Sequence, residues 1–462
     1  MKWILFLAYS FLVLIFGLIP AKSIKNNNDY FLASRSLSWR SLTFTLVASW
    51  YGASSIFVSI SEAYWKGLSS LWIIGVPAFL TLLIFSFFSR RIYNSEVNSI
   101  PEIFRKKNYK FSQVITSAII FWYLIVLSSS QLIALGQVIG GFLSIKYELS
   151  LLLGLLIILF YSTGGGLKSV VTTDKIQFFI IVGVILSVFI FLSEKNFNFF
   201  SSEEIMKLMN PFDSITENLL ITLSFTLAWL ISPIVWQRIK SGRNNYEVKK
   251  SLILSALILF FLYLISIGIG ILSHPFNFDK KEGELFILLI NKKLGIILGS
   301  LGFLAVVSAI MSTLDTTLNT SSMTFTWDVY GYFRKNLRGG LLKISRITLI
   351  GSGLLTFLIA YRMDGILKTL GFSSEIIACG FFIPLVYVFF SKRNSPNAVS
   401  LSMILGLIIP VWHFIQAFKL IPELFPAWPL SVPVGISMSF VGLILGIILD
   451  YFLTKKTLSL KE

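Results

Sequence analysis

The chain has 462 residues, of which 55% are hydrophobic and only 13% are charged. Soluble domains carry about a quarter of charged residues, so this composition excludes an ordinary soluble protein. The formal net charge of +17 would suit a nucleic-acid-binding protein. However, most of the Lys and Arg residues fall in loops on one side of the expected apolar spans, which is the distribution of a polytopic membrane protein.

Apolar runs long enough to cross a hydrocarbon core of about 30 Å recur along the whole chain, so we expect one all-α transmembrane domain over residues 1–462. We expect thirteen spans, at residues 3–20, 41–65, 70–89, 111–144, 149–163, 175–193, 214–236, 251–273, 294–327, 344–362, 366–390, 398–417 and 429–453. The first run is interpreted as a span and not as a signal peptide, because only Lys2 precedes it and no small-residue cleavage site follows it.

The basic residues also orient the chain. Loops 21–40, 90–110, 237–250 and 327–346 hold many of them, and Lys and Arg gather on the cytoplasmic side of membranes. With an odd number of spans, the N-terminus then lies outside and the tail TKKTLSLKE lies in the cytoplasm. We expect an integral protein of the plasma membrane, of the bacterial inner-membrane type.

Two five-helix units, residues 41–193 and 214–390, can be laid over each other in opposite orientation. The first helix of each unit is interrupted, at Ala48–Ser55 (ASWYGASS) in one unit and around Pro233 in the other. Paired broken helices at matching places indicate a midplane binding site in secondary transporters. No residue-by-residue repeat is visible, so this symmetry is inferred from spacing and topology.

The interruption at Ala48–Ser55 predicts free backbone carbonyls. Gly52 and the serines around it hold a helix poorly, since Gly costs about 1 kcal/mol relative to Ala in a helix. A helix that unwinds here leaves carbonyls without their i+4 partners. Hard cations are bound by several oxygen ligands, so these carbonyls are candidates to coordinate Na⁺.

The stretch Ser308–Asp328 is too polar to face lipid. It follows the apolar run 294–307, so hydropathy keeps it in the membrane, yet it is rich in Ser and Thr and contains Asp315. A carboxylate at mid-membrane costs about 2.5–3.5 kcal/mol on insertion scales. The stretch is therefore expected to face protein, water or an ion. Ser312 and Thr316 lie one turn apart on one face, and their hydroxyls either bind an ion or bond back to their own helix.

Two acidic side chains leave alternatives open. Asp174 follows an expected tight cytoplasmic turn at Gly164–Gly166, and it either caps the next helix or lies on an ion path. Glu375, in span 366–390, either acts as a gate or pairs with a basic residue.

Aromatic side chains that share a span with polar groups are candidates for a solute pocket. Tyr123 lies near Gln131 in span 111–144, and Phe225 lies near Trp229 in span 214–236. Each of these aromatic residues either walls such a pocket or packs at an interface, as aromatic residues commonly do in membrane proteins.

Four segments resemble the sodium:solute symporter family, which includes proline, pantothenate and sialic acid symporters and sodium–glucose transporters. They are DYFLASRSLSWRSL, ASWYGASSIFVSISEAYWKGLSSLW, YSTGGGLKSVVTTDKIQ and VVSAIMSTLDTTLNTSSMTFTWDVY. The last two are the most specific, and WQR at Trp236–Arg238 is a weaker match. Together the matching pieces spread over most of the chain.

The resemblance implies a leucine-transporter-like 5+5 inverted-repeat fold made of 41–193 and 214–390. One extra span at 3–20 and two at 398–453 would flank this core. The resemblance also implies a sodium site whose ligands are the carbonyls of Ala48, Tyr51 and Ala309 and the hydroxyls of Ser312 and Thr313.

Some members of the family hold a second sodium ion nearer the cytoplasm. Asp174 matches the loop aspartate of that site, and Asp315 and Thr316 stand where hydroxyl ligands occur. The resemblance thus implies a second site that contains carboxylates and takes sodium or a proton.

The expected solute pocket consists of Ser54, Ser55, Tyr123, Gln131, Phe225, Trp229 and Pro233, of which the last three match positions near the solute in the family. The proline symporters carry an aspartate where Trp50 stands, and the sugar transporters carry a glutamine about where Ser55 stands. The sequence therefore supports neither solute.

The predicted function is sodium-coupled uptake of a small polar organic solute by alternating access. The expected partners are the solute, Na⁺ and the lipid bilayer, with no nucleic acid. A proton-coupled transporter on the same fold and a non-transporting membrane sensor or channel are the alternatives. An enzyme is not expected, because the sequence shows no nucleophile–base or metal constellation.

Overall fold

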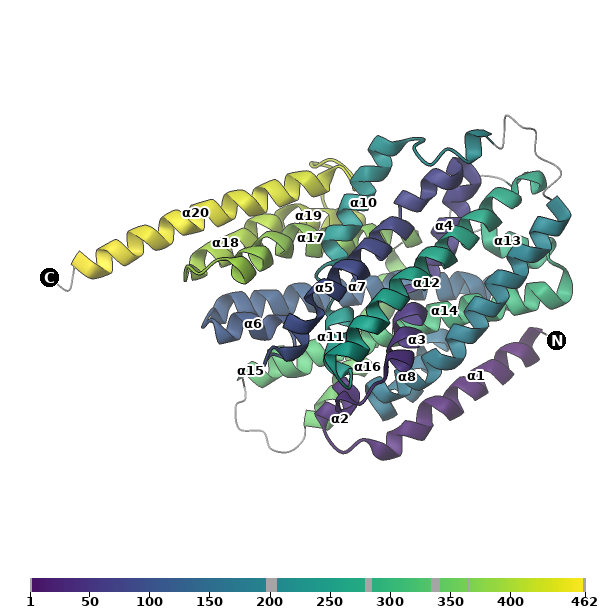
Figure 1. Cartoon of the computed structure of the whole chain (residues 1–462), viewed down its shortest axis with the longest axis horizontal. Helices are drawn as coiled ribbons and strands as arrows, with labels where there is room; N and C mark the ends of the chain where they lie inside the picture. Colours follow the sequence, from purple (N-terminus) through teal and green to yellow (C-terminus); the bar gives the residue numbers. More distant parts are fainter. Residues whose placement is uncertain (1, 197–205, 279–284, 334–340, 364, 460–462) are drawn as a thin grey trace.

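A computed structural model of the chain describes residues 2–196, 206–278, 285–333, 341–363 and 365–459 (Figure 1). Within these ranges the chain is helical, with no β-strand and one isolated bridge between Leu37 and Gly242. The expectation of an all-α fold is confirmed. Parts of the expected loops 194–213, 274–293 and 327–346, and the end of the tail 454–462, lie outside the described residues.

The first half of the chain contains α1 (Lys2–Leu18), η1 (Ile19–Ser23), α2 (Asn27–Leu32), η2 (Ala33–Arg35), α3 (Trp39–Trp50), α4 (Ala53–Lys66), η3 (Gly67–Trp72), α5 (Gly75–Asn94), α6 (Ile100–Lys106), α7 (Lys110–Leu143) and α8 (Tyr147–Asn196). The second half contains α10 (Ile215–Trp229), α11 (Pro233–Ser241), α12 (Asn245–Leu272), η5 (His274–Phe276), α13 (Leu285–Lys292), α14 (Gly295–Met323), the π-helical η6 (Thr324–Tyr330), α15 (Gly331–Phe333), α16 (Leu341–Arg362), α17 (Ile366–Phe390), α18 (Pro396–Gly406), α19 (Ile408–Ala417) and α20 (Ser431–Ser459).

Ten helical segments of the described chain are long and apolar enough to cross a membrane, or eleven when the bent pair α10–α11 counts as one span. The expected number was thirteen. Two of the segments, Ala53–Asn94 and Tyr147–Lys195, each contain regions that hydropathy divides into two spans. Each is about twice as long as a single crossing requires, so the number of crossings stays a prediction.

The expected tight turn at Gly164–Gly166 falls where the two helical arms of α8 meet, at Gly166. Gly166 alone takes a left-handed conformation, with φ 53° and ψ −138°, and α8 continues on both sides of it. Its Cα lies against Tyr30, because an ideal Cβ there would stand 2.4 Å from the Tyr30 carbonyl oxygen. One residue without a side chain is enough to redirect the helix, so no open loop is needed.

Both expected helix interruptions are confirmed. Between α3 and α4, Tyr51 and Gly52 leave the helical conformation, with ψ 60° and −162°. Between α10 and α11 the axis bends by 44°. There Pro233 begins α11, and the Ser232 hydroxyl accepts a hydrogen bond from the Val235 N–H as a cap.

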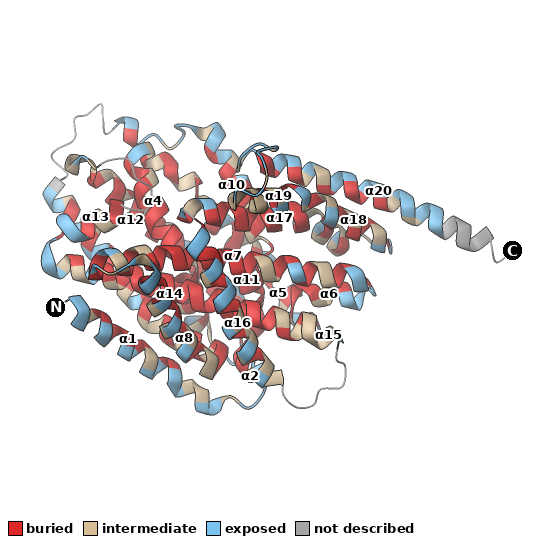
Figure 2. Cartoon of the chain, turned by 180° about the vertical axis from the view of Figure 1, so that it is seen from behind, coloured by how far each residue is buried: buried red, intermediate tan, exposed pale blue. Residues whose placement is uncertain are grey.

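The centre of the bundle is α14, which packs against α3, α7, α8, α13 and α16. Every residue from 305 to 324 is buried, and Figure 2 shows the same buried interior behind exposed outer helices. A helix that is buried on all sides has no face toward lipid. The expectation that the polar stretch avoids lipid is therefore confirmed for residues 308–324. In Figure 1, α1 begins at one end of the bundle and α20 ends at the opposite end.

The C-terminal helices pack closely through glycine. Gly442 and Gly446 on α20 are four residues apart, the spacing that lets membrane helices approach each other. An ideal Cβ on Gly446 would lie 2.2 Å from the Ala398 Cα on α18. This close packing joins α18 and α20 into one pair beside α17.

We expect Gly446→Ala to lower the midpoint of thermal unfolding of the purified protein, because overpacking costs about 1–3 kcal/mol. Gly351→Ala on α16 is the matched control, since an ideal Cβ there meets no heavy atom within 4 Å. Equal midpoints for the two variants would contradict the proposed contact.

Candidate functional site

The α3–α4 interruption and the polar helix α14 meet in the interior of the bundle. The Thr313 hydroxyl lies 2.9 Å from the Ser49 carbonyl oxygen and 3.1 Å from the Ala309 carbonyl oxygen. The two helices also join through the Ser49 and Thr316 hydroxyls, which are 2.9 Å apart. An ideal Cβ on Gly52 would lie only 2.3 Å from Thr313 Oγ1, so this close approach requires glycine.

The unwound segment presents backbone oxygens that the helix does not use. Among the described residues, the carbonyls of Ala48 and Tyr51 accept no hydrogen bond, whereas the carbonyl of Ser49 between them accepts one from Thr313. The Tyr51 side chain points away, because its hydroxyl bonds to Ser266 on α12. Both carbonyls thus keep their lone pairs for another partner.

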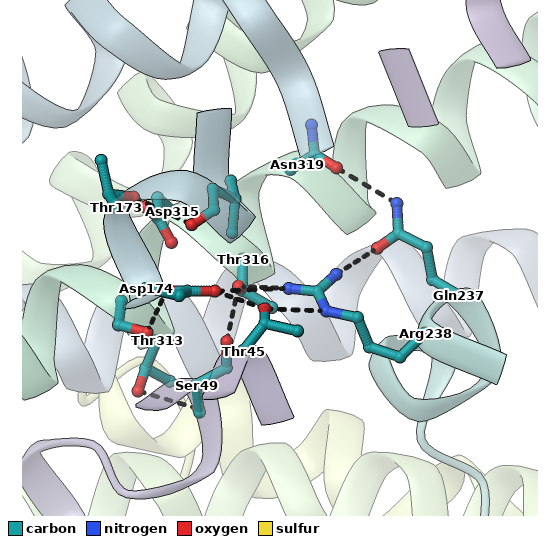
Figure 3. A network of polar contacts seen from close by, with 12 residues as sticks. Thr45, Ser49, Thr173, Asp174, Gln237, Arg238, Thr313, Asp315, Thr316 and Asn319 are labelled. Atoms are coloured by element: carbon teal, nitrogen blue, oxygen red, sulfur yellow. Dashed lines mark hydrogen bonds and ion pairs between the residues drawn. The ribbon is translucent and has the colours of Figure 1, made fainter. Parts of the chain in front are cut away.

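A buried polar network continues from this contact, as Figure 3 shows. Asp174 on α8 accepts hydrogen bonds from Ser312 on α14 and Thr45 on α3. The Arg238 Nη2 atom on α11 lies 4.0 Å from Asp174 Oδ2, and it donates to Thr316 Oγ1 at 2.9 Å. Asp174 and Arg238 are almost fully buried, with exposed fractions of 0% and 1%.

The structure excludes one of the two alternatives for Asp174 and corrects the assignment of Arg238. Asp174 lies inside α8, eight residues beyond Gly166, so it does not cap a helix. Arg238 was placed in a basic loop, but it lies in α11, the short helix that Pro233 begins. The signal for Arg238 was its place as the last residue of the WQR match, after an apolar span that a proline interrupts.

Asp315 is the second buried carboxylate of the region. Its Oδ2 atom accepts a hydrogen bond of 2.5 Å from the Tyr161 hydroxyl on α8. Its Oδ1 atom has no partner within the described part of the chain. A buried carboxylate oxygen without a partner carries a large desolvation cost, so this atom is a candidate ligand for a proton or an ion.

A cavity of about 50 Å³ lies between the two helix interruptions and adjoins the Thr313 contact. The described residues that line it are Ser49, Trp50, Gly52, Ser54, Ser55, Tyr123, Leu127, Gln131, Trp229, Ser232, Ile234, Thr313 and Leu370. None of these side chains is charged. The rings of Trp50 and Trp229 meet edge to face at 5.6 Å, one from each broken helix.

Five of the expected pocket residues line this cavity, namely Ser54, Ser55, Tyr123, Gln131 and Trp229. The other two do not. Phe225 stacks behind Trp229, with ring centroids 5.0 Å apart, and Pro233 stands between two lining residues as the first residue of α11. Ser54, Ser55, Tyr123 and Gln131 were expected from their polar surroundings, whereas Leu127, Ile234 and Leu370 carry no polar signal that sequence reasoning could use.

Glu375 pairs with a basic residue, one of the alternatives that the sequence left open. Both of its carboxylate oxygens lie 3.0 Å from His413 Nδ1 on α19, and one also accepts from Ser431 on α20. The pair ties α17 to the C-terminal helices. The residues that line the cavity between the helix interruptions include neither Glu375 nor His413.

Comparison with known proteins agrees with this geometry. The model of the sodium:solute symporter family matches residues 30–406. A sodium/proline symporter of Haemophilus influenzae is 24% identical over 440 residues, which cover 88% of this chain and 86% of the relative. A sodium/glucose cotransporter of Vibrio parahaemolyticus is 22% identical over 421 residues and covers 81% of this chain and 77% of the relative.

Solved structures give the fold. A substrate-bound, outward-open Na⁺-coupled sialic acid symporter superposes with a TM-score of 0.79 at 18% identity, over 97% of both chains. MhsT in complex with L-phenylalanine superposes with a TM-score of 0.53 at 15% identity, over 90% of this chain and 98% of MhsT. The expected leucine-transporter-like fold is thus confirmed. Because the family model covers most of its length, the chain belongs to the sodium:solute symporter family and is a sodium-coupled membrane symporter.

Proposed function

We propose that sodium binds between the α3–α4 interruption and α14, and that its binding there drives uptake of a small polar organic solute. The ligands are the carbonyls of Ala48, Tyr51 and Ala309 and the hydroxyls of Ser312 and Thr313. The observation that carries this proposal is the 2.9 Å contact of Thr313 with the Ser49 carbonyl, beside two carbonyls that accept no hydrogen bond within the described chain. Oxygen ligands of this kind suit a hard cation.

Sodium at this position links two elements that otherwise meet through few polar contacts. The break in α3–α4 belongs to residues 41–193 and α14 belongs to residues 214–390, so the ion joins the two proposed repeats. Binding that favours one arrangement of the repeats shifts the population of the transporter toward it. This is the physical basis of coupling: solute enters the cavity next to Thr313 when the ion has set the arrangement of its walls.

The electrochemical gradient sets the size of the effect. Moving one charge through 100 mV yields about 2.3 kcal/mol. A tenfold sodium gradient adds about 1.4 kcal/mol. One sodium ion per cycle therefore supports a several-hundred-fold accumulation of an uncharged solute.

The cavity supports a solute without net charge. None of its described lining residues is charged, and a net charge buried there would need compensation. Trp50 occupies the position where the proline symporters have an aspartate, so an amino group would meet an aromatic ring and not a carboxylate. Hydroxyl and amide groups of Ser54, Ser55 and Gln131 offer hydrogen bonds to a polar solute.

We propose a second cation position at Asp174, Asp315 and Thr316. Two carboxylates and one guanidinium, Arg238, leave one negative charge uncompensated when both acids are ionised. A second sodium ion or a proton at the unpartnered Oδ1 of Asp315 would balance the cluster. Balanced charge is a strong requirement in a low-dielectric interior.

The orientation of the chain is part of the proposal. The basic residues between the apolar spans favour a cytoplasmic C-terminus and an outside N-terminus. The start of α1 and the end of α20 lie at opposite ends of the bundle, which agrees with it. We propose a location in the plasma membrane and no enzymatic activity, in keeping with a family of transporters.

We expect sodium, but not choline, to raise the midpoint of thermal unfolding of the wild-type protein, because a ligand that binds only the folded state stabilises it. The double substitution Ser312→Ala and Thr313→Ala should abolish this shift, since it removes both hydroxyl ligands. Ser321→Ala on the same helix is the control, because its hydroxyl bonds to the Leu318 carbonyl three residues away. A sodium shift that survives in the double variant would refute the site.

We expect Gly52→Ala to weaken sodium and solute together. An added Cβ would lie 2.3 Å from Thr313 Oγ1 of the sodium site and 2.8 Å from Gln131 Oε1 of the cavity. Half-maximal uptake should require at least about tenfold more of each, since an overpacking cost of about 1.4 kcal/mol is a factor of ten. Gly183→Ala on α8, where an ideal Cβ meets nothing within 4 Å, should leave both constants unchanged. An effect on one ligand alone would argue against adjacent sites.

We expect Asp315→Asn to reduce by one the number of charges that enter with each solute molecule, because the neutral amide cannot balance a second cation. If that cation is sodium, uptake changes from a sigmoidal to a hyperbolic dependence on sodium; if it is a proton, uptake loses its dependence on external pH. The control is Asp328→Asn, a buried acid on η6 that accepts a hydrogen bond from Ser99. Unchanged charge stoichiometry in Asp315→Asn would rule out the second position.

A further inference from the structure

An apolar groove opens on the outer surface of the bundle, apart from the ion and solute sites. It has a volume of about 200 Å³ and lies between α5 and α17, with the α10–α11 interruption as its floor. Phe88 on α5 and Val386 on α17 form its walls, and Leu230 and Ile231 lie at its base. Phe88 and Val386 are exposed by 45% and 39%, so the groove is open to whatever surrounds the bundle.

The packing of the helices explains why the groove exists. Both α5 and α17 pack against α10, whereas they hardly contact each other. The bend between α10 and α11 therefore faces outward between two helices that stand apart. In a membrane protein, lipid acyl chains fill a space of this kind.

One end of the groove is basic. Arg91 is the one charged side chain among the described residues that line it. Its guanidinium lies over the Phe389 ring at 5.4 Å and reaches the Phe389 carbonyl oxygen at 3.5 Å, so most of its N–H groups are left for another acceptor. The Lys107 ammonium lies at the same end of α17, where it donates to the Val388 carbonyl at 2.7 Å and the Ser391 carbonyl at 3.3 Å.

The groove also contains a buried donor. Trp236 on α11 lines it and is only 5% exposed. Its indole N–H has no hydrogen-bond partner within the described chain. Buried polar groups are normally paired, so this donor indicates an acceptor that the protein itself does not supply.

From these observations we propose that the groove binds one anionic phospholipid of the surrounding bilayer. An acyl chain lies along Phe88 and Val386 over the α10–α11 interruption. The phosphate group binds Arg91, whose planar fork of donors matches phosphate oxygens, with Lys107 beside it. Basic pockets between membrane helices are suited to anionic headgroups.

The site gives the lipid contact with the bent segment between α10 and α11. Leu230 and Ile231 belong to the segment in which the chain bends by 44° between α10 and α11. A lipid packed against this segment stabilises the bent arrangement. The proposal does not depend on the identity of the solute or on the number of ions.

The test is lipid retention by the purified full-length protein, measured by native mass spectrometry after addition of phosphatidylglycerol or phosphatidylcholine with the same acyl chains. We expect the wild type to retain phosphatidylglycerol about fivefold better, since one basic group near an anionic headgroup contributes about 1 kcal/mol. Arg91→Gln should lose this preference and still retain both lipids weakly. Arg90→Gln, which changes the exposed neighbouring arginine that does not line the groove, should keep it.

A second pair of variants tests the groove itself. Val386→Trp fills it and should reduce retention of both lipids at least fivefold, whereas Val441→Trp on the exposed face of α20 should not. Equal retention of the two lipids by the wild type would overturn the proposal. So would equal losses in Arg91→Gln and Arg90→Gln, which would indicate general electrostatic attraction to a basic surface. Thermal unfolding of each variant shows whether it is folded.

Discussion

The structure depends on one contact, the meeting of an unwound backbone with a hydroxyl-rich helix inside a membrane protein. The α3–α4 interruption leaves the carbonyls of Ala48 and Tyr51 without hydrogen bonds in the described chain, and α14 brings Thr313 against the carbonyl between them. Unwound backbone at this depth is stable only where protein, water or an ion satisfies it. The unwound backbone therefore depends on α14 for hydrogen bonds, and the buried hydroxyls of α14 depend in turn on the polar groups of the unwound segment.

The charged groups around this contact form a second constraint. Arg238, Asp174 and Asp315 come from three different helices and are all buried. Hydroxyls of Thr45, Ser312 and Tyr161 hold the carboxylates, so each acid is oriented even without a full ion pair. Such a cluster is costly to assemble for stability alone, since hydrophobic residues of the same volume would serve as well. The free-energy cost of burying these charges is explained when the cluster binds and releases a cation.

The sequence was informative where local chemistry decides structure. Gly52 and Pro233 predicted both helix interruptions, and the Ser and Thr residues of 308–328 predicted a helix that avoids lipid. It was less informative where tertiary packing decides. Arg238 is 64 positions from Asp174, and its charge counted toward a loop until the fold placed it in α11. Phe225 stands behind Trp229 because a stacked pair exposes one ring to the cavity, and sequence does not say which.

The short helix α11 has a mechanical consequence. Trp236 and Arg238 are two residues apart, yet Trp236 borders the outer groove and Arg238 reaches the interior cluster. The nine residues of α11 thus separate the acyl chain proposed for the groove from the buried guanidinium of Arg238. Coulomb energy changes steeply with distance at low dielectric, and Arg238 stands 4.0 Å from Asp174. A tilt of α11 would therefore change the distance from Arg238 to Asp174 and the electric field at the proposed second cation position.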